Sequence, residues 1–141
     1  MKIKYGEIDF YYDWLLNNLK LSGKNNRMRM KFLEILQNNK QEYEKHRYQL
    51  IKENSRLDEN GNIVILNVDK NGAGEADIID KEKFFKELME LNLEEFVVEE
   101  NETNKEMLLI LKKCVEECPI EWQGEDALKY EVVCRLFDDI Y

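Results

Sequence analysis

The stretch KNNRMRMKFLEILQNNKQEYEKHRYQLIKENSRLDE, residues 24–59, decides the fold. It contains no glycine and no proline, and most of its residues favour helices. It therefore predicts one long, uninterrupted helix. At 1.5 Å per residue this helix has a length on the order of 50 Å, which is more than a domain of 141 residues can bury along its whole course.

The two halves of this helix differ in their apolar content. The first half is densely apolar, and the second continues only as a thin seam at seven-residue spacing, made of Leu36, Tyr43, Leu50 and Leu57. Such a seam needs an antiparallel neighbour or a second copy of the chain. We expect residues 8–59 to form an uneven helical hairpin, and we expect Leu36, Tyr43 and Leu50 to support a homo-oligomer.

The residues before this helix predict a strand and the first helix of the hairpin. Residues 2–5 alternate lysines with apolar side chains, which suits a short strand. From Ile8 to Leu19 the apolar residues recur at helical spacing, and Asp9 is the expected N-cap. Trp14 lies off this apolar face, so we expect another helix to cover it.

After the long helix the hydrophobic period changes from that of a helix to that of a strand. Residues 62–68 (NIVILNV) are rich in β-branched side chains, and with residues 76–79 they predict an antiparallel β-hairpin. A short strand is expected at residues 95–99, and the sheet is then either the hairpin alone or, if this strand joins it, a three-stranded sheet. Asp80 and Thr103 are the expected N-caps of two later helices. Helices are predicted at residues 81–91, 103–118 and 124–139.

These elements predict a predominantly α, α+β fold in a single domain over residues 1–141. A helical hairpin forms residues 1–59, and an acidic α+β subregion with C-terminal helices forms residues 60–141. The net charge is −9, but residues 1–57 carry +5 and residues 58–141 carry −14. A concentrated acidic face repels nucleic acid and attracts basic grooves, although acidic surface also serves solubility alone.

Targeting signals and cysteine content point to one compartment. The apolar runs are far shorter than the roughly 18 residues that span a bilayer, so no membrane segment is predicted. The first residues do not resemble a signal peptide, and three cysteines, an odd number, fit free thiols. We therefore expect the protein in the reducing cytoplasm of a host cell, without a cofactor.

Residues 69–80 partly match the loop that binds calcium in EF-hands. Asp69, Asn71 and Asp77 occupy ligand positions of that loop. Ala73 stands where another ligand is usual, and Asp80 replaces the long-armed glutamate that completes the loop. The sequence favours an acidic hairpin turn over a calcium site and leaves the question open.

Other metal and catalytic constellations are incomplete. Cys114 and Cys118 are four residues apart on one predicted helix, and Cys134 lies on the last helix, but a structural zinc site needs a fourth ligand. The only histidine, His46, lies on the distant part of the long helix. We therefore expect no metal site, no catalytic residues and no enzymatic activity.

Two charged groups are candidates for binding a partner. The basic run at residues 24–31 includes Arg27 and Arg29, which suit an acidic partner surface or pair internally with the acidic half of the chain. Direct binding of nucleic acid is not expected, because four cations are a small footprint on a chain of charge −9. The acidic candidates are Glu94, Glu95, Glu99, Glu100 and Glu102.

The order of these motifs carries a resemblance to a known family. The basic start of the long helix (residues 23–32), the Asn-Gly turn, and the segments at 91–96, 104–108 and 124–130 resemble a family of small proteins of tailed phages and prophages of low-GC Gram-positive bacteria. The resemblance covers nearly the whole chain and implies no active site.

This resemblance implies an accessory protein without enzymatic activity. We expect it to bind and inhibit a host protein, such as a nucleic-acid-binding component of a defence system, through an acidic surface, as an anti-CRISPR or other anti-defence protein does. The alternative is a virion or tail-assembly component that self-associates through the long helix.

Overall fold

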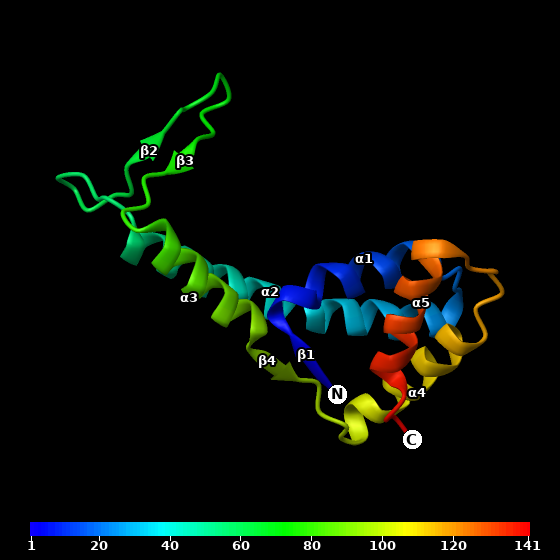
Figure 1. Ribbon diagram of the computed structural model, residues 1–141. Helices are drawn as coiled ribbons and strands as arrows, with labels where there is room; N and C mark the ends of the chain where they lie inside the picture. Colours follow the sequence, from blue (N-terminus) through cyan, green and yellow to red (C-terminus); the bar gives the residue numbers. More distant parts are fainter.

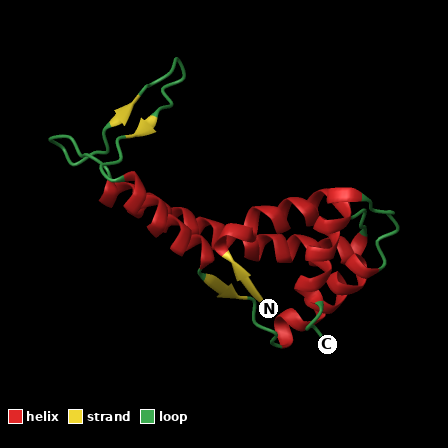
Figure 2. Ribbon diagram, viewed as in Figure 1, coloured by secondary structure: helices red, strands yellow, loops and turns green.

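The computed structural model describes residues 1–141 and contains five α-helices and two small antiparallel strand pairs (Figures 1 and 2). The helices are α1 (Ile8–Asn18), α2 (Gly23–Asn54), α3 (Lys81–Leu93), α4 (Glu102–Glu116) and α5 (Gly124–Phe137). The strands are β1 (Lys2–Lys4), β2 (Ile65–Leu66), β3 (Glu75–Ala76) and β4 (Glu95–Val97), and a 3-10 turn, η1 (Tyr5–Glu7), precedes α1. The predominantly helical α+β class is confirmed.

Figure 1 shows a helical body from which a long arm projects. We call residues 37–94 the arm: it contains the second half of α2, the helix α3 and the hairpin β2–β3. The hydrophobic core is one cluster of 18 buried residues, and all of them come from residues 3–36 and 96–140. The body therefore holds the core, and the arm extends beyond it.

The helix α2 is continuous from the body into the arm, as predicted, and it ends at Asn54. The Asn54 side-chain amide donates to the carbonyl of Leu50 at 2.9 Å, and the Ser55 hydroxyl donates to the carbonyl of Ile51. The backbone N–H of Ile79 then donates to the carbonyl of Asn54 at 2.8 Å. The helix stops before residue 59 because the returning hairpin takes up the hydrogen-bonding groups at its end.

The thin seam of α2 has its neighbour inside the chain. Helix α3 runs antiparallel to the second half of α2 (Figure 1), and the Tyr43 hydroxyl donates to Asn92 Oδ1 at 2.5 Å. Leu36 is fully buried, Tyr43 is 7% exposed and Leu50 is half-buried. Leu36 and Tyr43 are therefore buried by contacts within the chain, and Leu50 is covered in part, so self-association through this seam stays a prediction.

Strand β4 pairs with β1, so of the two predicted arrangements the hairpin forms without a third strand. The antiparallel register places Ile3 opposite Phe96, and both side chains are buried in the core. Val98 continues the same alternation, and its N–H donates to the carbonyl of Met1 at 2.8 Å. The buried faces of the two strands complete the body's core, whereas the hairpin β2–β3 forms as predicted but has no core to cover.

One short motif, Asp-x-Asn-Gly, makes the same turn at both ends of the hairpin's first strand. It occurs at residues 58–61 and again at residues 69–72. In each case the aspartate Oδ1 accepts hydrogen bonds from the backbone N–H groups two and four residues later, at 2.8–3.0 Å. Gly61 and Gly72 adopt φ values of 77° and 80°, a backbone region that favours glycine.

The observed helix starts confirm one predicted N-cap and correct two others. Asp80 caps α3 by accepting from the N–H of Lys83 at 3.1 Å. Helix α4 is capped by Asn101 instead of Thr103, because the Asn101 side chain already accepts from the third helical N–H. Helix α1 follows directly from η1 without a side-chain cap, so Asp9 lies inside the first turn.

Candidate functional site

Arg29, a predicted partner-binding residue, is buried in the body. Its Nη1 donates to the carbonyls of Leu15 (3.3 Å) and Leu19 at the end of α1, and its Nη2 donates to Asn26 Oδ1 at 2.7 Å. Only 8% of Arg29 is exposed. It holds α1 against α2 and is not accessible to a partner, which corrects the prediction.

The other cations of the basic run divide between internal contacts and the surface. Lys24 forms an ion pair with Glu106, and Lys31 Nζ donates to the carbonyl of Thr103 at 2.9 Å. Both contacts tie the start of α2 to α4 and so support the internal interpretation of this run. Arg27 is exposed and remains the one predicted arginine that a partner can reach.

The predicted acidic residues lie along the edge of the body from the end of α3 to the start of α4. All five are exposed: Glu94, Glu95, Glu99, Glu100 and Glu102. Positive groups lie beside two of these carboxylates. The amino terminus of Met1 is 3.3 Å from Glu100 Oε1, and Lys4 is opposite Glu95 in the strand pair. The local negative potential is therefore weaker than the count of carboxylates indicates.

The arm carries an apolar surface that sequence analysis did not single out. Large apolar side chains are between 43% and 66% exposed on both the hairpin and the adjoining helices: Tyr48, Ile65, Leu66, Val68, Ile79, Phe85 and Met89. We call these seven residues the arm patch. Four of them lie in or beside the hairpin, which accounts for their exposure: β2 and β3 pair with one another and with no third strand.

A groove of 680 Å³ follows part of the arm patch. It lies where the hairpin meets α2 and α3, and Tyr48, Ile65 and Phe85 contribute to its walls. Its lining is mostly apolar, with Arg47, Glu75 and Lys81 as the charged members. A long apolar concavity of this kind is typical of a surface that receives another chain.

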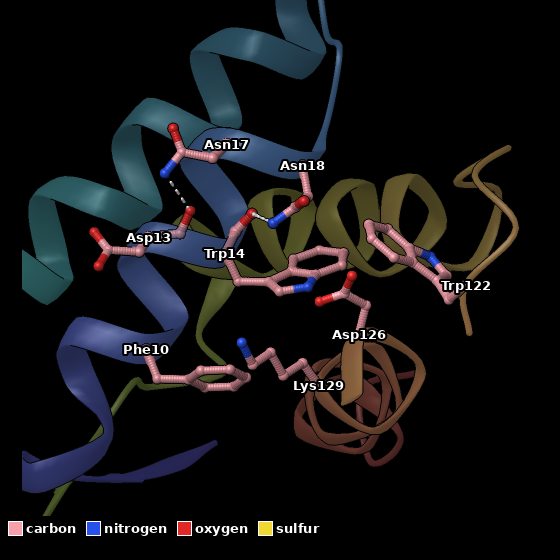
Figure 3. A pocket seen from close by; sticks show the side chains of 8 residues that line it. All are labelled: Phe10, Asp13, Trp14, Asn17, Asn18, Trp122, Asp126 and Lys129. Carbon is pink, nitrogen blue, oxygen red and sulfur yellow. Dashed lines mark hydrogen bonds between the residues drawn. The ribbon is translucent and has the colours of Figure 1, made fainter. Parts of the chain in front are cut away.

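A second concavity lies in the body between α1 and α5 (Figure 3). It has a volume of 310 Å³ and is walled by Phe10 and Trp14 of α1 and by Trp122 of the connection before α5. The position of Trp14 off the apolar face of its helix predicts that another helix covers it. No pattern in the sequence indicates that Trp122 lies beside it. The two indole ring centroids are 5.8 Å apart, and we call this concavity the indole pocket.

No cluster of three or more His, Cys, Asp or Glu side chains is arranged to hold a metal ion. One oxygen of Asp69 accepts two hydrogen bonds within its own turn, which stabilises the candidate calcium loop as a hairpin turn. Cys114, Cys118 and Cys134 are free, partly buried thiols. Burial raises the pKa of Cys114 and Cys134, which keeps these two thiols protonated and weakly nucleophilic.

Tyr130 couples α5 to α4 and gives the fold an expected dependence on alkaline pH. Its hydroxyl donates to the carbonyl of Val115 at 2.7 Å, and burial, the main cause, raises its pKa from 10.0 to about 12. In the unfolded chain the phenol ionises at the lower value. The contribution of Tyr130 to the free energy of unfolding is therefore at its full value below pH 10 and is lost as the pH rises towards 12.

We expect the stability advantage of the wild type over Tyr130→Phe to be constant below pH 10 and to shrink between pH 10 and pH 12. The comparison with phenylalanine removes the contribution of Tyr11, whose pKa burial also raises to about 12. Urea unfolding of both proteins at a series of pH values measures the difference. An advantage that persists unchanged to pH 12 would contradict the assignment.

No helix combines the length and the apolar content that crossing a membrane requires. Comparison of the chain with protein-family models, with curated proteins and with solved structures gives no match, so the candidate sites rest on the geometry of this chain's own residues.

Proposed function

We propose that the chain is a non-enzymatic binding protein and that the arm makes contact with its partner. The observation that carries this proposal is the distribution of apolar side chains: the 18-residue core cluster takes none from the arm, and the arm buries three apolar side chains of its own but exposes the seven of the arm patch. Single apolar side chains are also exposed on the body, Leu128 and Val132 among them, but three of those on the arm line one groove. Exposed apolar surface that is grouped in this way marks an interaction site. The hairpin edge adds free backbone groups that another chain can pair with.

The proposed partner is a host protein, in line with the resemblance to phage accessory proteins. Residues 55–80, which form the hairpin, carry six acidic and two basic side chains, so the hairpin has a net charge of −4. Apolar contact surrounded by charge is the usual anatomy of a specific interface. An acidic hairpin favours a basic surface, such as the groove of a nucleic-acid-binding defence component, and this is the acidic surface we propose for an anti-CRISPR or other anti-defence role.

The second candidate function is a virion or tail-assembly component. The same unpaired hairpin edge and arm patch would then meet a second copy of the chain. This differs from the original expectation in its location, because the seam of α2 is buried and the arm is exposed. The two functions predict different partners for one surface.

The test replaces two residues of the arm patch at once. The double variant Phe85→Glu with Met89→Glu places charges at positions that are 58% and 64% exposed, so it should fold like the wild type. The matched control is Leu128→Glu on α5, 69% exposed and outside the arm. Affinity capture from a low-GC Gram-positive lysate and light scattering of the purified proteins are the measurements.

We expect the wild type and the Leu128→Glu control to capture a host protein in stoichiometric amount. The double variant should capture at least about tenfold less of that protein. An oligomer that dissolves in the double variant, with no host protein captured, would establish the assembly function instead. If capture and oligomeric state are the same in all three proteins, the arm is not the binding surface. Charge reversal at Glu99 and Glu100 tests the body's acidic edge in the same way.

A further inference from the structure

We infer that the indole pocket binds an organic cation of the ammonium or guanidinium type. Its source is either a lysine or arginine side chain of a partner or a free small molecule, and the two share this chemistry. The pocket is lined by residues of α1, of α5 and of the connection before α5. Figure 1 shows both helices in the body, away from the hairpin end of the arm, so the inference is independent of the proposed function.

The aromatic walls of the pocket are held in a fixed arrangement. Tyr130 stacks on Trp14 with ring centroids 5.8 Å apart and on Trp122 with centroids 5.7 Å apart, both at interplanar angles near 25°. Phe10 stands one helical turn before Trp14 and extends the wall along α1 (Figure 3). Trp14 is 5% exposed, so Phe10 and Trp122 supply most of the aromatic surface that a ligand can reach. Aromatic faces attract cations within about 6 Å of the ring centroid, and rings that are already fixed offer this attraction without an ordering cost.

Two carboxylates line the same pocket, and neither pairs with a lysine or arginine side chain of the chain. Asp13 is on α1 and Asp126 is in the first turn of α5, and neither forms an ion pair within 4.0 Å. Figure 3 shows the Asp126 carboxylate projecting from α5 towards the two indole rings. Aromatic faces combined with unpaired carboxylates are the chemistry that recognises alkylammonium and guanidinium groups.

The remaining polar groups of the pocket also act as acceptors. The side-chain amides of Asn17 and Asn18 donate to the carbonyls of Asp13 and Trp14 at 2.9 and 3.1 Å, which leaves their oxygen atoms free. The indole N–H of Trp122 has no hydrogen-bond partner, and it is enclosed by protein atoms and does not open onto the pocket. The accessible polar atoms therefore match a donor ligand with positive charge, with one exception.

The exception is Lys129, whose side chain reaches from α5 across the pocket towards α1 (Figure 3). It forms neither an ion pair within 4.0 Å nor a hydrogen bond to a carboxylate. A bound cation would meet its positive charge, so Lys129 is a competitor that the chain carries itself. Its removal should strengthen binding, which distinguishes a cation site from a site for an anion.

The chain offers a specific signal for this test, because its only two tryptophans both line the pocket. Tryptophan fluorescence and the two indole N–H cross-peaks in a ¹H–¹⁵N spectrum therefore report on the pocket alone. The probes are N-acetylarginine methylamide, N-acetyllysine methylamide and tetramethylammonium chloride, at constant ionic strength. The neutral control is N-acetylcitrulline methylamide, which keeps the shape of the arginine probe without its charge.

We expect a saturable change with the cations below about 50 mM and none with the citrulline probe. Asp126→Asn should weaken binding by about fivefold, and Lys129→Ala should strengthen it by about threefold. The matched control is Glu125→Gln, which removes a carboxylate from the same turn of α5 but not from the pocket, and it should leave binding unchanged.

The outcomes separate the two sources of the cation. Tighter binding of the arginine or lysine probe than of tetramethylammonium indicates a partner's side chain, and the reverse order indicates a free small cation. No saturable change with any cation, an equal change with the citrulline probe, or equal affinity in Asp126→Asn and the wild type would overturn the inference. All these positions are exposed or on the pocket rim, and the spectra of the variants verify that each one folds.

Discussion

Replacement of Phe137 by alanine is expected to lower the free energy of unfolding by about 3–5 kcal/mol. Phe137 is 1% exposed, and its ring centroid is 6.0 Å from that of the fully buried Phe32, so it joins α5 to α2 in the centre of the core. Alanine removes the ring and leaves a cavity that close-packed neighbours fill only in part. Urea unfolding followed by far-UV circular dichroism measures the loss.

The matched control is the same substitution on the arm, Phe85→Ala. Phe85 is 58% exposed, so its truncation should change the free energy of unfolding by less than about 0.5 kcal/mol. Under the proposed function this variant loses affinity for the partner instead. Equal destabilisation by Phe85→Ala and Phe137→Ala would contradict the division into a body that holds the core and an arm that lies outside it.

Replacement of Arg29 by alanine is expected to lower the free energy of unfolding by about 2–4 kcal/mol. The change leaves the carbonyls of Leu15 and Leu19 without their buried donor and also removes the contact with Asn26. The last carbonyls of a helix have no partner within the helix, so this guanidinium acts as an external cap for α1. Denaturant unfolding again gives the loss.

Arg27→Ala is the control for this prediction, because Arg27 is exposed two residues earlier in the same helix. It should leave the free energy of unfolding within about 0.5 kcal/mol of the wild type. Arg29→Lys should recover only part of the loss, because one ammonium group does not reproduce the planar fork that spans the acceptors. Equal stability of Arg27→Ala and Arg29→Ala would show that Arg29 is not a structural residue.

The helices could be predicted from the sequence because their signals are local. Helix α4 shows this well: Met107, Leu108, Leu111 and Val115 recur at helical spacing, and all four are fully buried. The Asp80 cap and the β-hairpin were also predicted, since capping and turn chemistry depend on neighbouring residues. The repeated Asp-x-Asn-Gly motif is a further local signal, and it would have defined the two turns of the hairpin more closely.

The partners of these elements could not be predicted, because they depend on residues distant in the chain. Strand β4 had two possible neighbours of similar composition, and the buried pair Ile3 and Phe96 decides for β1 only once the core exists. The basic run looks like a charged surface, yet Arg29 is drawn inside by the unpaired carbonyls at the end of another helix. Charge alone does not indicate whether a cation faces water or caps a helix.

The candidate sites show the same limit. Phe84 and Phe85 are adjacent in sequence and equally apolar, yet the first is 8% and the second 58% exposed, because the arm has no second layer to cover both. Trp14 and Trp122 come from opposite ends of the chain and meet only when α5 packs against α1. The arm patch is exposed because no second layer covers it, and the indole pocket is formed by residues far apart in the chain. Neither feature produces a periodic pattern in the sequence.

The arm leaves the body through α2 and returns to it at β4, which the pairing with β1 fixes in the body. The entropic cost of closing a flexible loop rises only with the logarithm of its length, so doubling the loop adds about 0.6 kcal/mol. The length of the hairpin is therefore nearly free to vary while the body stays the same. Under the proposed function, a change of hairpin length or sequence would therefore alter the contact with the partner and leave the packing of the body as it is.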